Sequence, residues 1–510
     1  MREISVGAPR GRSQPFRGRL SSLALAGVVA VCLGIALLGL VRAVGSTSAV
    51  PTRATPTAST TAAAVTTTAT ATATSAEPTV APNPTPTASP TASPTPSPAP
   101  EPTVLREIRV DDGSEPAISA SPYDPNLIAV IDEHIVWSRG CSNPAVSISR
   151  DAGRTWAAAK APWGNGCQDM HAVIAWGPGP KPGTSRLWVA DAVGVIEGVS
   201  LSVTYSDNEG ASWAPVYIQK FTQPWVGCYP AIAVDNSPAS PNFGAVYLAY
   251  NWRPSYLGTA IVVIATRDGT HWVHADVTPI GLNGYPSTWT FGNRVAVAPD
   301  GSAYVSFYEA DLRHWDSEDM FDQGETANVG RTGFVTAHLH FGESLSADKP
   351  LWSVGLLPTR GAAFDPESQS GLAIADSGAL WLVVNDTVRT GGTIRIGSST
   401  NEGRDWTWRI LDVPNAQGFK ASLALAGDRV FVGWHAEGKD GLIRTYYTLS
   451  YDDGATFPAP RLATASTYLE PRIVNGTGLR ENAVFENGRI YYAWGDNRNG
   501  IATYVVTIQP

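Results

Sequence analysis

The sequence predicts an all-β domain built from one repeated unit, and three observations lead to this prediction. An eight-residue segment, Ser149–Trp156, recurs with starts at residues 206, 266, 399 and 450. Successive starts are 51 to 60 residues apart, except for one interval of 133 residues that spans about two periods, and such spacing indicates a repeated supersecondary unit. Pairs of short, strand-like apolar segments lie between the copies. Residues 43 to about 103 offer almost no side chains for a core, and the repeated units occupy residues 104–510.

The amino-terminal region predicts a membrane anchor. The stretch from Leu20 to Val41 is uncharged and mainly apolar over 22 residues, and a transmembrane helix needs about 20 such residues. Five arginines precede the stretch and two closely follow it. This asymmetry predicts a cytoplasmic basic tail at 1–19, a transmembrane helix at 20–42, and an extracellular remainder. A cleaved signal peptide is the alternative, and it would also export the remainder.

Residues 43–103 are mostly Thr, Pro, Ala and Ser. Such a composition offers almost no side chains for a core, so it predicts a disordered linker that leans toward the polyproline II conformation. The whole chain carries a formal net charge of −9. An acidic chain of this kind argues against nucleic acid as a partner, because phosphates require a basic surface.

The repeated segment has the composition of a tight turn. Its Asp or Asn can accept backbone N–H bonds, its Gly can adopt a positive φ, and its terminal aromatic can pack between units. We therefore expect it to join the third and fourth strands of each unit. The copies are Ser149-Arg-Asp-Ala-Gly-Arg-Thr-Trp156, Ser206-Asp-Asn-Glu-Gly-Ala-Ser-Trp213, Thr266-Arg-Asp-Gly-Thr-His-Trp272, Ser399-Thr-Asn-Glu-Gly-Arg-Asp-Trp406 and Ser450-Tyr-Asp-Asp-Gly-Ala-Thr-Phe457.

Seven strand pairs accompany these turns, each a small apolar strand followed by a more aromatic or β-branched one. Small residues in the first strand suit the crowded axis of a β-propeller. We therefore predict a propeller of seven four-stranded blades, with six blades and an irregular unit around residues 310–350 as the alternative. Leu105–Val110 would supply the fourth strand of the last blade and close the ring. The first strands begin at Ala117, His171, Pro230, Arg294, Leu372, Leu423 and Asn482.

The pattern S-x-D-x-G-x-[TS]-[WF] resembles the Asp box, or BNR repeat, of the sialidase superfamily of β-propellers. Sialidases clamp the sugar carboxylate with three Arg, attack with a Tyr that a Glu assists, and use an Asp as acid/base. The resemblance implies Tyr229 as nucleophile, Glu481 (or Glu115) as its helper, and Asp169 (or Asp132) as acid. Arg294 and Arg480 would bind the sugar carboxylate, with Lys420 nearby. The order of these residues differs from the family's, and two Arg enter first strands rather than three.

Strand alternation places the starts of first strands and the ends of second strands on the face opposite the repeated turns. Carboxylates, a few cations and aromatics gather there, which is typical of a carbohydrate site. The competing interpretation is that these polar residues only cap strand ends. The second strands leave through Asp132, Glu133, Asp191, Asn251, Trp252, Glu309, Asp311, Asn385, Asp386, Trp434, His435, Trp494 and Asp496.

Cysteine usage suits an exported domain. Cys32 lies in the predicted anchor, and we expect one disulfide among the other three, first of all Cys141 to Cys167, with Cys228 left as a thiol. The cysteine spacings are too wide for a metal site. We expect no cofactor and no metal, and oligomeric state stays open.

Two functions have support in the sequence, beside a third, a scaffold for assembling other envelope proteins, for which the sequence offers no specific feature. The leading one is a membrane-anchored, extracellular, sialidase-like propeller that acts as an exo-glycoside hydrolase on glycans. The alternative is a non-catalytic propeller that binds a glycan or protein on the cell surface.

Overall fold

The computed structural model describes most of residues 101–510. The described residues are 101–136, 141–162, 171–195, 198–220, 230–255, 258–276, 288–311, 333–341, 345–347, 371–386, 393–411, 416–468 and 482–510. The basic tail, the predicted transmembrane helix at 20–42 and nearly all of the predicted linker lie outside these residues. Within the described part, no helix is long and apolar enough to cross a membrane.

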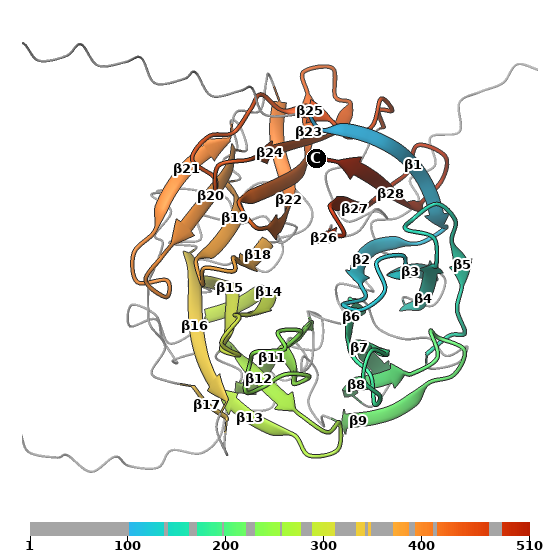
Figure 1. Ribbon diagram of the computed structural model, residues 1–510, viewed down its shortest axis with the longest axis vertical. Helices are drawn as coiled ribbons and strands as arrows, with labels where there is room; N and C mark the ends of the chain where they lie inside the picture. Colours follow the sequence, from blue (N-terminus) through green and yellow to red (C-terminus); the bar gives the residue numbers. More distant parts are fainter. Residues whose placement is uncertain are drawn as a thin grey trace, which may run out of the picture. The chain divides into compact units, whose positions relative to one another are not determined.

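In this part of the chain the structure is all-β, as predicted. The described residues form seven four-stranded antiparallel sheets (Figure 1), which we number in chain order. Sheets one to three are β2 Ser114–Ala120, β3 Ile128–Val136, β4 Cys141–Ser149, β5 Ala157–Ala158; β6 Val173–Pro178, β7 Ser185–Val195, β8 Gly198–Ser206, β9 Ala214–Lys220; β10 Ala231–Val234, β11 Val246–Ser255, β12 Gly258–Thr266, β13 Val273–Asp276. Sheets four to six are β14 Thr288–Val297, β15 Ala303–Asp311, β16 Gly333–Phe341, β17 Leu345–Ala347; β18 Gly371–Ile374, β19 Leu380–Asp386, β20 Thr393–Ser399, β21 Thr407–Leu411; β22 Ala416–Ala426, β23 Arg429–Gly438, β24 Ile443–Ser450, β25 Arg461–Leu462. Sheet seven is β26 Asn482–Glu486, β27 Arg489–Asp496, β28 Ala502–Gln509 and β1 Thr103–Asp111.

The sheets follow one another around a ring, which confirms the β-propeller. The first strand of each sheet contacts the first strand of the next, and β26 of sheet seven contacts β2 of sheet one. First strands such as β2, β6 and β18 lie nearer the centre in Figure 1 than fourth strands such as β5, β9 and β21. Each sheet therefore runs outward from the axis in chain order, with sheet seven completed by a strand from the other end of the described chain.

The ring closes as the sequence predicted, through the segment at Leu105–Val110. This segment lies in β1, which pairs antiparallel with β28 from Thr103 opposite Gln509 to Asp111 opposite Thr503. Figure 1 shows β1, in blue, alongside β28, in red. The pairing joins the two ends of the domain in one sheet, in which β28 lies between β27 and β1, and β1 forms the outer edge.

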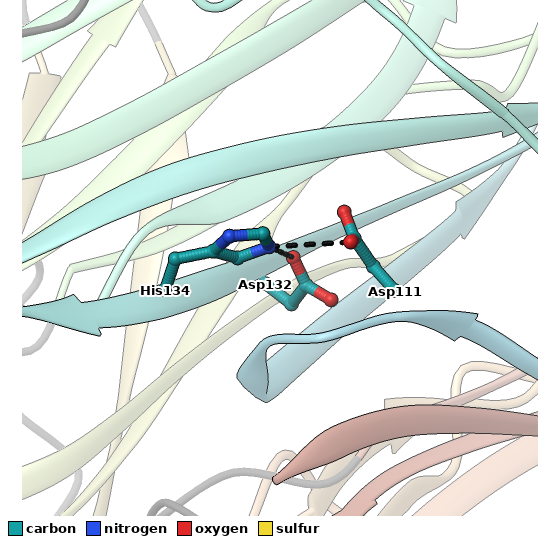
Figure 2. A group of neighbouring side chains, drawn as sticks. All are labelled: Asp111, Asp132 and His134. Carbon is teal, nitrogen blue, oxygen red and sulfur yellow. Dashed lines mark ion pairs between the residues drawn. The ribbon is translucent and has the colours of Figure 1, made fainter. Parts of the chain in front are cut away.

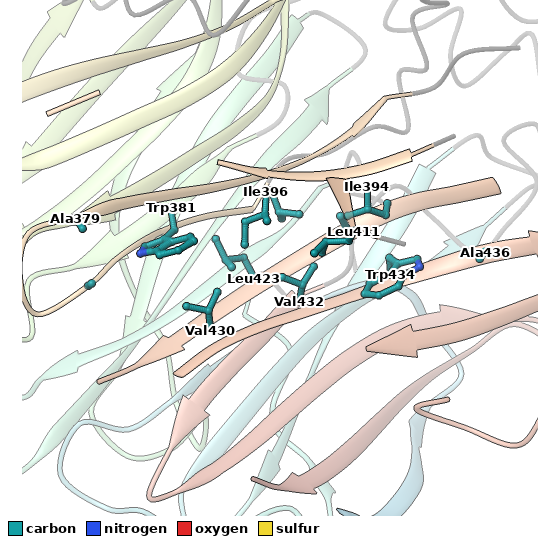
Figure 3. Packing of buried hydrophobic residues seen from close by; sticks show 13 residues of the cluster. Ala379, Trp381, Ile394, Ile396, Leu411, Leu423, Val430, Val432, Trp434 and Ala436 are labelled. Carbon is teal, nitrogen blue, oxygen red and sulfur yellow. The ribbon is translucent and has the colours of Figure 1, made fainter. Parts of the chain in front are cut away.

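Apolar side chains fill the spaces between neighbouring sheets. Figure 3 shows one such cluster, in which Trp381 and Ile396 of sheet five pack against Val432 and Trp434 of sheet six. Strand alternation lets one strand serve two neighbours. In β3, Ala129 and Ile131 pack toward sheet two, whereas Ile128 and Val130 pack toward sheet seven. The core is thus a ring of inter-sheet layers, and residues two apart in a second strand face the same neighbour.

All five repeated segments are turns between third and fourth strands, as predicted. In the last copy the Ser450 hydroxyl accepts the Gly454 N–H at 2.9 Å, and Asp452 Oδ1 accepts the Thr456 N–H at 2.8 Å. Gly454 has φ +67°, and a Cβ there would overlap the indole of Trp381 in the preceding sheet. The repeated glycine therefore supplies both a left-handed conformation and close packing between sheets.

Two other expectations meet the described residues only in part. The region around 310–350 contributes the end of β15 together with β16 and β17, and these strands pair within sheet four. Cys141 begins β4. Cys167 and Cys228 lie outside the described residues, so the disulfide stays a prediction.

Candidate functional site

The two ends of the sheets differ in what they carry. Because each repeated turn joins a third strand to a fourth, these turns lie at one end of their sheets, which we call the repeat end. The starts of first strands and the ends of second strands lie at the other end, which we call the opposite end. The polar residues singled out from the sequence belong to the opposite end.

Three ionisable residues at the opposite end have left-handed backbone conformations. Their φ angles are 54° at Glu115, 89° at His171 and 51° at Lys420. Glu115 and Lys420 lie inside β-bulges in the first strands of sheets one and six, and His171 precedes the first strand of sheet two. All three side chains are buried. Left-handed non-glycine residues cost about 1–3 kcal/mol each. Others among the described residues lie in turns, including Ala152, Glu209, Glu402 and Asp453 of the repeated segments, whereas these three carry buried ionisable side chains.

Glu115 and His171 form a buried pair that joins two neighbouring sheets. Glu115 Oε2 lies 2.9 Å from Nδ1 of His171, and the two side chains are 4% and 5% exposed. A carboxylate held against an imidazole can exchange a proton between them. It is one of the carboxylate–imidazole groups that the described part of the opposite end contains.

Glu133, the residue at the end of β3 that faces sheet two, positions His171. Its Oε1 accepts the backbone N–H of His171 and, at 2.8 Å, the N–H of Ala172. Glu133 is itself fully buried. Two N–H bonds to one carboxylate are charge-assisted, so Glu133 fixes the strained backbone from which the His171 ring projects.

A second buried imidazole lies in sheet six. The hydroxyl of Tyr468 lies 2.7 Å from Nδ1 of His435, and the Thr445 hydroxyl lies 3.0 Å from the same atom. Burial, and then the charges of Lys420 and Arg498, lowers the pKa of His435 well below its usual value. His435 is therefore neutral near pH 7 and acts as a hydrogen-bonding group between sheet strands.

Arg498 lies in an ion-pair network of sheet seven. Its guanidinium contacts Asp496, with Nε 2.8 Å from Oδ2, and Glu107 of β1. It also lies 3.9 Å from the ring centroid of Tyr504. The network ties β1 to the β27–β28 connection, so this cation is used in closing the ring.

A third group lies where sheet seven meets sheet one. Figure 2 shows Asp111 of β1 beside Asp132 and His134 of β3. His134 Nε2 is 3.3 Å from Asp111 Oδ1 and 3.8 Å from Asp132 Oδ1. Burial, and then the charge of Asp111, raises the pKa of Asp132 to about 7. Among the described residues, this is the group of carboxylate and imidazole ligands close enough together to hold a metal ion.

The predicted catalytic set falls mostly outside the described residues. Arg294 lies in β14, opposite Ser306 and directly after a bulge, and its side chain is partly buried. Tyr229, Glu481, Asp169 and Arg480 lie beyond the described ranges, so their roles stay predictions. The alternative helper Glu115 is brought together with His171, and the alternative acid Asp132 with Asp111 and His134.

Sequence reasoning placed Glu115, Glu133 and His171 at the opposite end but paired none of them. It did not single out Asp111, His134 or Arg498. One available signal was the period of two along β3, because Asp132 and His134 share a face of the strand while Glu133 points away from it. The pairing across sheets carried no local signal.

Comparisons with known proteins concern the fold. No family model matches the sequence, and no curated protein matches it. Among solved structures, the chain is similar to the α-L-arabinofuranosidase Arb93A from Fusarium graminearum in complex with an iminosugar inhibitor, with 14% identity and a TM-score of 0.43 over 66% of this chain and 93% of that one. It is also similar to the polysaccharide lyase Uly1, with 13% identity and a TM-score of 0.45 over 80% of this chain and 99% of that one. A third similar structure is Ycf48 bound to D1 peptide, with 12% identity and a TM-score of 0.41 over 79% of this chain and 95% of that one.

Proposed function

We propose that this chain is a carbohydrate-active propeller, an exo-acting glycoside hydrolase of the sialidase type, whose reacting groups lie at the opposite end. The observation that carries the proposal is the buried pair of Glu115 and His171, 2.9 Å apart. Glycoside hydrolysis needs groups that give and take a proton at the glycosidic oxygen. A strained, buried carboxylate and imidazole supported by Glu133 are suited to that task.

Cations at the same end support an anionic sugar as the substrate. Arg294 directly follows the bulge of β14 in sheet four and Lys420 lies inside the bulge of β22 in sheet six, rather than at the strand starts that the sequence predicted. The sequence adds Arg480 near the start of sheet seven. Arg binds a carboxylate through two parallel hydrogen bonds. Tyr229 precedes Pro230-Ala231 as Glu115 precedes Pro116-Ala117, so we propose it as the nucleophile at the equivalent position of sheet three.

The test is hydrolysis of a fluorogenic sialoside, beside a panel of neutral glycosides, by the full chain in detergent. Glu115→Gln and His171→Asn should each reduce sialoside turnover by about 10²- to 10⁴-fold, since general acid–base catalysis contributes that much. Asn suits the left-handed position of His171. Tyr229→Phe and Arg294→Ala should also abolish or strongly reduce turnover.

The matched control is His271→Asn at the repeat end. His271 Nδ1 lies 2.6 Å from Asp268, which makes an exposed carboxylate–imidazole pair, and its loss should leave turnover unchanged. Full turnover by both Glu115→Gln and His171→Asn would refute the role of the buried pair. No turnover of any glycoside by the folded wild-type chain would refute the hydrolase.

The alternative function is a non-catalytic propeller that binds a glycan or protein. The observation in its favour is that Arg498 and His435 are both held in buried hydrogen-bonded or ionic contacts within the ring. Such contacts hold a scaffold rather than a reacting substrate. Binding on a glycan array without turnover, lost on Arg294→Ala, would favour this function.

The proposal includes a location at the cell surface. Its support is the sequence: the apolar stretch at 20–42 follows a basic tail and precedes the Thr- and Pro-rich linker at 43–103. Deletion of residues 20–42 should move the protein from the membrane fraction to the soluble fraction of cells. Retention in the membrane fraction after that deletion would refute the anchor.

We also propose that the ring has seven blades, one for each sheet. The support is that the first strands of seven sheets contact one another in sequence and that β26 contacts β2. The sialidase-type propellers that the repeats resemble have six. Face-on averages of single particles by electron microscopy would separate a seven-fold from a six-fold ring.

A further inference from the structure

The junction between sheet seven and sheet one brings three potential ligands together. Asp111 is the last residue of β1, where the pairing with β28 ends. Asp132 and His134 are two residues apart in β3 and share the strand face that packs toward sheet seven. Figure 2 shows the three side chains converging across this junction. Any ion bound there would connect the closing sheet to the next sheet in the ring.

The distances suit a small tetrahedral ion. Nε2 of His134 is 3.3 Å from one oxygen of Asp111 and 3.8 Å from one oxygen of Asp132, and the three ligand atoms all lie within 4.8 Å of one another. Two ligands at about 2.1 Å from a tetrahedral Zn²⁺ are about 3.4 Å apart. The observed spacings therefore need only small side-chain adjustments to surround one ion.

Asp132 supplies an independent reason to expect a ligand. Its side chain is 2% exposed, yet neither carboxylate oxygen has a hydrogen-bond partner among the described residues. The Thr503 hydroxyl lies close enough to Asp132 to offset part of the rise in its pKa that burial causes, but its hydrogen bond goes to the carbonyl oxygen of Gly113, at 3.2 Å. A Cβ at Gly113 would overlap the Asp132 carboxylate, so the chain leaves room for that carboxylate. A buried carboxylate without a hydrogen-bond partner is unfavourable, and the His134 contact at 3.8 Å is too long to be a hydrogen bond. A bound cation would supply the missing interaction.

Asp111 and His134 leave the group accessible to an ion, and the ligand types determine which ion it would bind. The Asp111 and His134 side chains are 23% and 39% exposed, so water can reach the group and complete the coordination. Mg²⁺ and Ca²⁺ prefer oxygen ligands alone. One imidazole nitrogen with two carboxylates suits a first-row transition ion such as Zn²⁺.

We propose that Asp111, Asp132 and His134 bind one divalent transition-metal ion, with Zn²⁺ preferred, which links sheet seven to sheet one. The expectation of no metal, made from the cysteine spacings, did not consider this group. The site is independent of the proposed glycosidase. The ion reinforces the seam at which the two ends of the domain meet, and it stabilises the folded ring by an amount that grows with the logarithm of the ion concentration above its Kd.

The test uses the full chain in detergent, stripped with a chelator and titrated with ZnCl₂, MgCl₂ or CaCl₂. Calorimetry with a competing chelator should show one Zn²⁺ site that Mg²⁺ and Ca²⁺ do not fill. Zn²⁺ should also raise the melting temperature. Asp132→Asn and His134→Gln should each weaken Zn²⁺ binding by at least about 100-fold and remove the shift in melting temperature.

His271→Gln is the matched control, because it removes an exposed imidazole that is also paired with a carboxylate, and it should keep the Zn²⁺ site. His134 is partly exposed, so His134→Gln tests the proposal even where Asp132→Asn fails to fold. Equal Zn²⁺ binding by His134→Gln and wild type would overturn the proposal. Absence of Zn²⁺ binding by the folded wild type at millimolar concentration would also overturn it, and would leave the group as an ion pair.

Discussion

The two ends of the propeller use carboxylates in contrary ways. At the repeat end, Asp452 is exposed and accepts hydrogen bonds from Thr456 and Ser450, which lower its pKa to about 2. At the opposite end, burial raises the pKa of Asp132 to about 7, and neither of its oxygens has a hydrogen-bond partner among the described residues. The first carboxylate is satisfied locally by its own turn, whereas the second depends on groups from another sheet.

This contrast separates scaffold from site. The repeat end contains the same type of turn five times, so its residues recur along the chain. The opposite end carries three different ionisable residues with left-handed backbones, in or just before the first strands of three sheets: Glu115, His171 and Lys420. Residues that recur from unit to unit therefore serve the fold. Residues that differ between units at similar backbone positions are candidates for contact with a ligand.

The largest effect on stability is expected at Glu133, which supports the opposite end. Glu133→Ala leaves the N–H groups of His171 and Ala172 buried without their acceptor. At about 1–3 kcal/mol for each unsatisfied group, the free energy of unfolding should fall by about 2 to 6 kcal/mol. Urea unfolding followed by tryptophan fluorescence measures this change.

Glu133→Gln is the conservative control, because its amide oxygen can still accept these bonds. It should lose clearly less stability than Glu133→Ala. Equal losses in the two variants would mean that the charge, rather than the two backbone bonds, holds this end together.

A somewhat smaller loss of stability is expected from a substitution at the repeat end that disturbs packing rather than hydrogen bonding. Gly454→Ala places a methyl group against Trp381 in a residue with φ +67°. The left-handed backbone costs about 1–2 kcal/mol and overpacking about 1–3 kcal/mol, so unfolding should become easier by about 2 to 5 kcal/mol. The melting temperature and the urea midpoint should both decrease.

Gly488→Ala isolates the backbone contribution. Gly488 has φ +69°, and a Cβ there would meet nothing within 4 Å. Its variant should lose only the backbone part of the Gly454→Ala effect. If the two variants were equally destabilised, close packing of the repeated turn on the preceding sheet would contribute nothing.

The fold was predictable because its signals are local and repeated. The turn residues of Ser450–Phe457 and the small residues of first strands such as Ala117–Ala120 each specify a short segment. Even the long-range pairing of β1 with β28 could be predicted, since the last unit lacked a fourth strand and Leu105–Val110 was left over. Repetition converts local signals into a topology.

The sequence predicted at which end of the sheets the candidate site lies, but not which of its residues are in contact. Alternation of strand direction placed Glu115, His171 and Asp132 at one end, but it could not say which of them would meet. That outcome depends on bulges and on left-handed residues at sheet junctions, as at Glu115. The contacts of Glu115 with His171, and of Asp111 with His134, join different sheets and leave no trace in local sequence.

The smallest expected effect is the pH dependence of stability that Asp452 contributes at the repeat end. Hydrogen bonds from Thr456 and Ser450 lower the pKa of Asp452 from 3.8 to about 2 in the folded protein. A carboxylate with a lowered folded pKa stabilises the fold above its unfolded pKa, and this contribution is lost as pH falls through the folded pKa. Asp452→Asn should therefore be slightly less stable than wild type at pH 7, and the difference should shrink between pH 4 and pH 2.

Urea midpoints over pH 2–7 measure this difference in stability. The control is Asp428→Asn, at an exposed residue of the β22–β23 turn. Asn already occupies the equivalent place at Asn208, where its Oδ1 accepts the Ser212 N–H at 2.9 Å. The turn itself should therefore survive, and a difference that persisted unchanged at pH 2 would show that the charge of Asp452 plays no part in it.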